Sequence, residues 1–293
     1  MMHIQKIKEK YDKKDGSLYG KNNIEDSLAM LYHENSKFTS HSLRTQGEII
    51  GSFSSPFITE RCVQPYKCYP GQVQIDLNAY IKSNPAKDFF TILHRRKSIR
   101  DYQKDYKISL NELGILLYNS YGVTKKSKIE GLDKEAHLGF RNVPSGGGLY
   151  PLEMYIVLFK SHIPLGLYHY RPDINCLEEI KQGLFLKELS EVIQAEPYTA
   201  IQNASAIVMT TGLIERQTIK YGERAYRFLM QESGAVGQNI SLIAETLQLG
   251  ACWVGGYLDD KLNEFLGIDG VFETINNVII IGKKQEKTVS DSL

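Results

Sequence analysis

The segment that most constrains the fold is the longest periodic stretch of the chain, residues 223–249. Its apolar side chains recur in steps of three, four or multiples of these, which is the spacing of one face of an α-helix. They stand at Ala225, Leu229, Val236, Ile240, Ile243 and Leu247. Gly234 and Gly237 lie inside this predicted helix, each at a cost of about 1 kcal/mol of helix propensity. The two glycines therefore predict a close approach, either by a second helix or by a ligand.

Short apolar runs elsewhere have the length of buried strands. They are residues 152–159, 204–212 and 276–282. Ser109 and Glu112 form the sequence pattern of a capping box, which predicts a helix over Leu110–Tyr121, whereas the polar residues 125–139 predict a loop. Because helices and strands do not alternate as regular βαβ units, we expect an α+β fold.

The regular pattern begins near residue 86. Residues 1–85 hold short apolar patches broken by SFSSPF, QPYKCYPG and KSNPAK, so we expect an N-terminal extension over 1–85, a docking or dimer arm, before a main domain over 86–293. The chain opens with charged residues, without the apolar core of a secretory signal, and has no apolar run of about 18 residues. We therefore expect a cytoplasmic protein that does not span a membrane.

Charge and cysteine content exclude several classes of partner. The 35 Lys and Arg against 34 Asp and Glu give a net charge of +1, which favours neither nucleic acid nor an acidic membrane. Four cysteines are present, and the six-residue step from Cys62 to Cys68 matches no zinc or redox spacing. We expect reduced thiols and no metal site.

The first candidate site is the basic stretch RRKSIRDY, residues 95–102. Four cations within six residues, beside the hydroxyl of Ser98, suit an anion, because arginine forks match phosphate oxygens. A solvated basic turn is the alternative. Asp101 and Asp105 interrupt the cluster, which argues against nucleic acid.

The second candidate is the loop PSGGGLYP, residues 144–151. Three glycines between prolines make an open backbone whose N–H groups could line a flat ligand. No GKS or GKT follows, so it is not a P-loop, and a plain loop is the alternative. Two weaker candidates are Lys220-Tyr221, a potential base with a proton donor, and Gly255-Gly256 after a predicted strand.

Taken together, these stretches resemble the nitroreductase-like flavoproteins, and more narrowly the SagB/ThcOx-type azoline dehydrogenases. The resemblance rests on six stretches in the family's order, between about residues 88 and 284. They are RRKSIRDY, PSGGGLYPLEMYIV, GLYHYRPD, IKYGERAYRFLMQESGAVGQN, VGGYLDD and NNVIIIGKK. It implies a nitroreductase-like fold, with a mixed central sheet flanked by helices, and FMN bound at a homodimer interface.

The same resemblance implies roles for individual residues. It assigns Lys220 and Tyr221 to catalysis, the lysine taking the ring C–H proton while the flavin accepts a hydride. The residues implied to bind FMN are Arg96, Lys97, Ser98, Pro144, Ser145, Gly146, Glu232, Gly255, Gly256, Lys283 and Lys284. Gly255-Gly256 replaces the acidic-Gly pair of typical nitroreductases, which favours the azoline branch.

The implied reaction is oxidation of a thiazoline or oxazoline to the azole in a peptide natural product. The substrate would be a ribosomal peptide or a carrier-protein-bound intermediate, and the partner a cyclodehydratase or a peptide synthetase. Two alternatives remain open at this point: an NAD(P)H-dependent nitro- or quinone reductase, and a non-catalytic flavin-binding scaffold of a cyclodehydratase complex.

Overall fold

The computed structural model describes residues 32, 48, 66–80, 88–128 and 137–285. The chain divides into two compact units, Met1–Gly51 and Ser52–Leu293. Most of the predicted N-terminal extension lies outside the described residues, and so does Cys62. The features below all belong to the second unit. Among its described residues, no helix has both the length and the hydropathy that a bilayer crossing requires.

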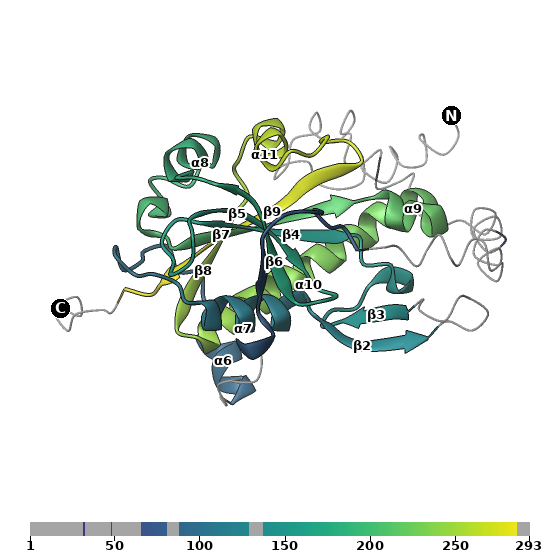
Figure 1. Ribbon diagram of the computed structural model, residues 1–293, viewed down its shortest axis with the longest axis horizontal. Coiled ribbons are helices and arrows are strands. Elements are labelled where there is room, and N and C mark those ends of the chain that lie inside the picture. The colour runs from purple at the N-terminus through teal and green to yellow at the C-terminus, as the bar shows by residue number, and fades with distance from the viewer. Residues whose placement is uncertain (1–31, 33–47, 49–65, 81–87, 129–136, 286–293) are drawn as a thin grey trace, which may run out of the picture. The chain divides into compact units, whose positions relative to one another are not determined.

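A seven-stranded sheet in the order β1-β6-β5-β4-β7-β9-β8 forms the centre of this unit (Figure 1). Its strands are β1 (Gln74–Asp76), β4 (Leu152–Leu158), β5 (Gly166–Arg171), β6 (Cys176–Gln182), β7 (Ala206–Leu213), β8 (Leu249–Val254) and β9 (Glu273–Lys283). The α+β class is confirmed, but the mixed sheet is a wrong prediction, because each named strand pairing in it is antiparallel. Among the residues that the structure describes, parallel contacts are limited to isolated bridges such as Ser98 to Ala251.

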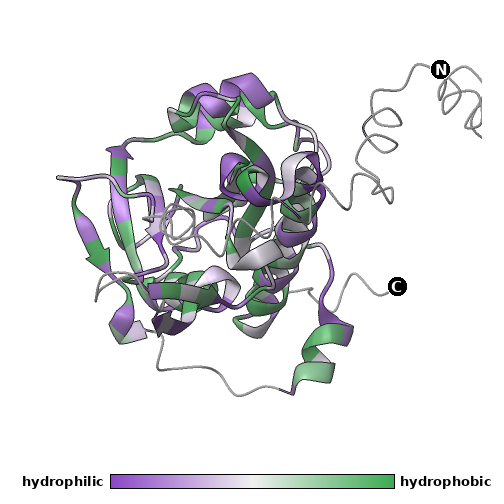
Figure 2. Ribbon diagram, turned by 90° about the vertical axis from the view of Figure 1, so that its right-hand side faces the viewer, coloured by the Kyte–Doolittle hydropathy of each residue, from purple (hydrophilic) through white to green (hydrophobic). Residues whose placement is uncertain are grey.

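Helices cover both faces of the sheet. Alternate residues of β4 point to opposite faces, as a pleated strand requires. Met154 and Ile156 join the core under α7 (Leu110–Tyr121) and α10 (Ala225–Thr246), whereas Tyr155 and Val157 join the core under α8 (Leu186–Val192) and α11 (Asp259–Leu266). Figure 1 shows α8 and α11 on one side of the strands and α7 and α10 on the other. Coloured by hydropathy, these helices carry apolar and polar residues side by side (Figure 2).

Helix α7 follows the local prediction in full. The Ser109 hydroxyl accepts from the Glu112 backbone N–H, and the Glu112 carboxylate accepts from the Ser109 N–H at 2.9 Å. The loop predicted over 125–139 is wrong, because β2 (Val123–Lys128) and β3 (His137–Arg141) form a separate two-stranded sheet. Strand β2 contains three lysines and so lacks the alternation of apolar and polar residues that predicts a strand. Its side chains are mostly exposed and need not be apolar.

Residues 66–80 contribute directly to the central sheet. Strand β1 pairs with β6, and Leu77 is fully buried in the core under α7. The main domain therefore uses residues that precede the regular sequence pattern.

The two glycines of α10 have different surroundings. A Cβ on Gly237 would overlap the indole of Trp253, whereas a Cβ on Gly234 would meet nothing within 4 Å. A close approach exists at Gly237, but the contacting group is the Trp253 side chain of β8, and neither the second helix nor the ligand that was expected.

We predict that Gly237→Ala lowers the free energy of unfolding by about 1–3 kcal/mol, because the tryptophan must shift. Gly234→Ala is the matched control and should raise it by roughly 0.5–1 kcal/mol through helix propensity alone. Urea denaturation of both variants measures the difference. Equal effects at the two positions would contradict this account of the helix.

Candidate functional site

The glycine-rich loop between β3 and β4 has an unusual backbone. Gly147 and Gly148 have φ values of +68° and +67°, and Tyr150 has a φ of +45°. The first two need glycine, since an L side chain rarely adopts this region. The Ser145 hydroxyl accepts from the Tyr150 backbone N–H at 2.9 Å and closes the loop. Strained backbone of this kind occurs often at binding sites.

Lys220 and Tyr221 lie directly against this loop. They end α9 (Glu215–Tyr221), a short helix before α10. A Cβ on Gly147 would stand 2.7 Å from the Tyr221 Oη and 3.2 Å from the Lys220 Nζ. The Tyr221 ring is held edge-on by Phe228, with 4.9 Å between ring centroids. The structure therefore brings together the glycine loop and the Lys220-Tyr221 pair, which are about 75 residues apart in sequence. At position 147 a side chain would crowd this pair, so the position suits glycine.

Burial raises the pKa of the Tyr221 phenol above its ordinary value. The hydroxyl therefore keeps its proton near neutral pH and can donate it in a hydrogen bond. A protonated phenol beside an amine is a suitable pair for handling one proton.

Glu232 adjoins the same loop from α10. The carboxylate is almost fully buried and accepts from the Tyr121 hydroxyl at 2.6 Å, while its Oε2 makes no hydrogen bond. Burial raises the pKa of Glu232 to about 7, although Ser145, Tyr121 and Arg141 pull it down.

Arg141 and Gln217 also carry buried polar atoms without a hydrogen-bond partner. These are the Arg141 Nε and Nη1 and the Gln217 Oε1. The Arg141 guanidinium carbon lies 4.2 Å from the centroid of the Tyr121 ring and 5.1 Å from that of Tyr150. Buried polar groups normally have partners, so orphaned atoms around an open glycine loop indicate a site for a polar ligand.

The raised pKa of Glu232 predicts a pH-dependent stability. In the folded chain the Glu232 carboxyl keeps its proton up to about pH 7, whereas in the unfolded chain it releases the proton near pH 4.5. Because the folded state binds more protons between these pH values, the free energy of unfolding falls as pH rises from 4.5 to 7. Glu232→Gln should remove this pH dependence. The free energy of unfolding of the variant, relative to that of the native chain, should therefore rise by on the order of 3 kcal/mol between pH 4.5 and pH 8. Urea denaturation at both pH values checks this, with the exposed Glu188→Gln as control. A pH-independent difference would contradict it.

The basic stretch that the sequence predicts to bind an anion lies near the far end of α10. The segment after α6 (Phe89–Arg95) runs beside β8, where the Ile99 N–H donates to the Ala251 carbonyl at 3.0 Å. The Gln103 N–H donates to the Lys283 carbonyl at 2.9 Å, so the stretch holding Arg96, Lys97 and Ser98 lies beside Lys283 and Lys284.

The cations of this group differ in how they are engaged. Lys284 forms an ion pair with the buried Glu245, and the Lys283 Nζ lies 5.1 Å from the centroid of the Tyr106 ring. Arg96 is half-buried, and Lys97 and Ser98 are exposed. Two cations and a hydroxyl at the surface, backed by two further lysines, could hold a phosphate.

Gly255 and Gly256 continue the edge strand β8 away from this anion site. Both are exposed, and a Cβ on Gly255 would meet nothing within 4 Å. The Gly256 carbonyl accepts from the Gln194 N–H at 2.8 Å. The strand edge between the lysines and Gly255 could therefore line an elongated ligand.

The candidates thus fall into two groups. The first lies along β8 and the end of β9; the second surrounds the glycine loop, with Pro144, Ser145, Gly146, Lys220, Tyr221 and Glu232. Lys284 contacts α10 at Glu245, near the end of the helix. The glycine loop contacts α10 at Phe228, 17 residues earlier. At 1.5 Å per residue the two contacts are about 25 Å apart along the helix. The lysine end of the first group is therefore far from the glycine loop along α10, whereas β8 packs on the helix between these two contacts, at Gly237.

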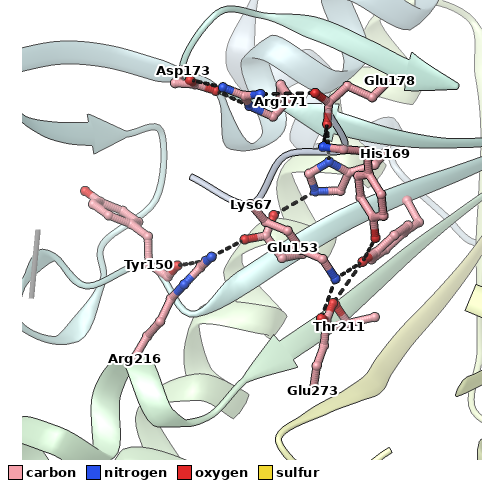
Figure 3. Close-up of polar contacts among 12 residues, drawn as sticks. Lys67, Tyr150, Glu153, His169, Arg171, Asp173, Glu178, Thr211, Arg216 and Glu273 are labelled. Carbon is pink, nitrogen blue, oxygen red and sulfur yellow. Dashed lines mark hydrogen bonds and ion pairs between the residues drawn. The ribbon is translucent and has the colours of Figure 1, made fainter. Parts of the chain in front are cut away.

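A buried ion network extends from the second group across the sheet (Figure 3). Arg216 donates to the Tyr150 carbonyl at 3.1 Å and pairs with Glu153 at 2.5 Å, and Glu153 contacts His169 at 2.8 Å. His169 in turn contacts Glu178, at 3.3 Å. Burial by itself would raise the pKa of Glu153, but Arg216 and His169 outweigh it and hold the pKa at about 2.

A second branch of polar contacts lies on the same sheet. Lys67 pairs with Glu273 at 2.5 Å, and Glu273 also accepts from Tyr155 and Thr211 (Figure 3). Lys67, Arg216 and Glu273 line an open cleft of about 650 Å³ beside α9, together with Leu213, Glu215, Thr218 and Ile219.

Sequence reasoning did not single out Arg141, Glu153, Arg216 or Gln217 as site residues. A signal existed for Glu153, which is a lone carboxylate inside an otherwise apolar strand. Arg141 stands three residues before the glycine loop, at the end of β3, a strand that was not predicted. The contacts of all four depend on tertiary packing that local patterns do not contain.

Comparison with known proteins gives a consistent result. Residues 93–283, more than half of the chain, match the sequence model of the Nitroreductase family. The protein MJ1384 of Methanocaldococcus jannaschii, named for the nitroreductases, is 33% identical over 178 residues, which are 60% of this chain and 83% of that protein.

Two further relatives are named for peptide processing. The microcin B17-processing protein McbC of Escherichia coli is 23% identical over 56% of this chain and 58% of its own length. The trifolitoxin-processing protein TfxB of Rhizobium leguminosarum bv. trifolii is 25% identical over 61% of this chain and 48% of its own length. The chain therefore spans about half the length of these two proteins.

Solved structures show the same fold. A structure from Anabaena variabilis, named for the nitroreductases, has a TM-score of 0.68 at 25% identity and covers 87% of this chain and 46% of its own. A chain of the E. coli microcin synthetase McbBCD complex, with truncated pro-MccB17 bound, has a TM-score of 0.55 at 19% identity. That match covers 88% of this chain and 92% of the other.

Proposed function

The chain belongs to the nitroreductase family, and we propose that it is an FMN-dependent enzyme oxidising thiazoline or oxazoline rings in peptides to azoles. Proteins of this family are generally oxidoreductases, and they typically bind FMN. The similarity to McbC and TfxB, both named for processing of peptide products, supports a peptide substrate. The observation that carries the proposal is the contact of Lys220 and Tyr221 with the glycine loop at Gly147.

The residues present fit FMN on structural grounds. Arg96, Lys97 and Ser98, with Lys283 and Lys284 behind them, suit a phosphate group. The open glycine loop and the orphaned buried atoms of Glu232 and Gln217 suit the polar edge of a flat ring. When bound, FMN supplies the two-electron acceptor that the oxidation requires.

We infer that two copies of the chain complete each FMN site. The two groups of candidate residues contact α10 about 25 Å apart at 1.5 Å per residue, so a phosphate site from one protomer would be joined by the glycine loop of its partner. In solution the chain should sediment as a homodimer.

The protein side chains handle the proton in this proposal. Lys220 is the proposed base that removes the C–H proton of the azoline ring, and its Nζ lies 5.5 Å from the centroid of the Tyr221 ring. The Tyr221 hydroxyl, whose pKa is raised by burial, is the proposed proton donor beside it. The half-buried Phe228 packs edge-on against this tyrosine and limits its motion.

The partner is proposed to be a cyclodehydratase, which forms the azoline that this enzyme would oxidise. The fold shared with a chain of the McbBCD complex, solved with truncated pro-MccB17 bound, supports an assembly of this kind. A carrier-protein-bound substrate on a peptide synthetase is the other form of the same chemistry.

The test is an anaerobic titration of the FMN-loaded protein with a synthetic thiazoline peptide. Bleaching of the flavin absorbance, with loss of two hydrogens from the peptide by mass spectrometry, is the expected result. The similarity to MJ1384 favours a second candidate, an NAD(P)H-dependent nitro- or quinone reductase. Bleaching by NAD(P)H but not by the thiazoline would select that function. Absence of FMN binding would exclude both.

A further inference from the structure

Helix α9 is too short to hold its own position. It has seven residues, and its N-cap residue, Ile214, provides no side-chain cap. Helices of this length are marginal in isolation, so the place of α9 depends on tertiary contacts. Lys220 and Tyr221 stand at its end, and any rotation of the helix would move them away from Gly147.

Arg216 supplies the strongest contact of α9. Its guanidinium group is nine-tenths buried and donates in two directions, to the Glu153 carboxylate at 2.5 Å and to the Tyr150 carbonyl at 3.1 Å. Glu153 belongs to the central strand β4, and Tyr150 ends the glycine loop. One side chain therefore ties α9 both to the sheet and to the loop that Lys220 and Tyr221 contact.

The anchor on the sheet side is itself rigid. Glu153 is 3% exposed and is held on its other oxygen by the fully buried His169, which also contacts Glu178 (Figure 3). Arg171 and the Tyr69 backbone N–H hold Glu178 in turn, at 3.0 and 3.1 Å. Arg216 thus binds a carboxylate whose position is already determined by the strands behind it.

We propose that Arg216 is a positioning residue, which sets α9 so that Lys220 and Tyr221 lie against the glycine loop. The inference rests on the proposed catalytic function of that pair. A planar guanidinium can make both contacts at once, and a lysine ammonium has no such fork. Lys220 follows Arg216 by four residues, close to one helical turn, so the anchor acts on the same face of the helix.

The main test variant is the double substitution Arg216→Ala/Glu153→Gln. Removing Arg216 alone would leave a buried carboxylate without its cation, whereas the double variant removes both charges. We expect kcat for thiazoline oxidation to fall about 100-fold, the scale of a misplaced catalytic group, while KM and FMN affinity change less than about twofold. Glu188→Gln, at an exposed position of α8, is the control and should keep wild-type activity. Wild-type kcat in the double variant would overturn the inference.

Access through the cleft allows a rescue experiment. Arg216 lines the open cleft of about 650 Å³, so a free guanidinium ion can reach the space left by Arg216→Ala. Millimolar guanidinium should raise the kcat of Arg216→Ala about tenfold or more by occupying the carboxylate site. Lys220→Ala should not respond.

Hydrogen exchange gives a readout that does not depend on activity. Backbone amides of α9 should exchange about tenfold faster in the double variant, while those of α7 stay unchanged. If the native enzyme oxidises no thiazoline but α9 loosens in this way, the proposed function fails and the positioning role stands. Unchanged exchange of α9 overturns the positioning role whatever the activity.

Discussion

Replacing Lys220 with alanine is expected to reduce thiazoline oxidation by about 100- to 10,000-fold, the range that a general base contributes. The lysine lies against Gly147 in the loop proposed to contact the flavin. FMN should still bind, because the phosphate group is proposed to bind at the opposite end of α10. Stopped-flow measurement of flavin reduction by a thiazoline peptide gives the rate.

Two variants control this result. Lys187→Ala removes an exposed lysine of α8, on the other face of the sheet, and should leave the rate unchanged. Tyr221→Phe removes one hydrogen bond and should cost about tenfold, less than the loss of the base. Full activity of Lys220→Ala, with FMN bound, would remove this residue from the mechanism.

The second large effect is expected at the opposite end of α10. Arg96→Ala should weaken FMN binding by about 10- to 100-fold, since one charge-assisted hydrogen bond to a phosphate contributes about 1.5–3 kcal/mol. Riboflavin, which lacks the phosphate, should bind the variant and the native chain equally. Fluorescence titration of both flavins measures the affinities, and a loss shared by riboflavin would place Arg96 away from the phosphate.

Mixing the two impaired variants tests the shared site. If Arg96 and Lys220 of one FMN site come from different protomers, random exchange of subunits between Arg96→Ala and Lys220→Ala should restore about a quarter of the sites. At limiting FMN, activity should then rise well above that of either parent. No recovery after confirmed subunit exchange would mean that both residues serve the same protomer's site.

Local sequence patterns predicted much of the fold. The Ser109–Glu112 capping box defines the start of α7 through contacts only three residues apart, and the apolar run 152–158 is a central strand. The polar segment 125–139 was misread because β2 and β3 lie outside the main sheet, so their lysines face solvent and no apolar alternation marks them. The antiparallel direction of the sheet was also beyond the local pattern, since it depends on how distant strands pair.

By itself, the sequence determined several of the main helices and strands, and the residue types of the candidate site. These are the basic stretch 95–100, the glycine loop 144–148 and the pair Lys220-Tyr221, each visible because its chemistry lies in adjacent residues. Only the tertiary structure decided that the pair touches Gly147 and that the basic stretch lies at the other end of α10. It also decided that Arg216 and Glu153, 63 residues apart in sequence, form one buried ion pair. The reason is physical: a charged side chain can enter the protein interior only where folding brings a partner to it.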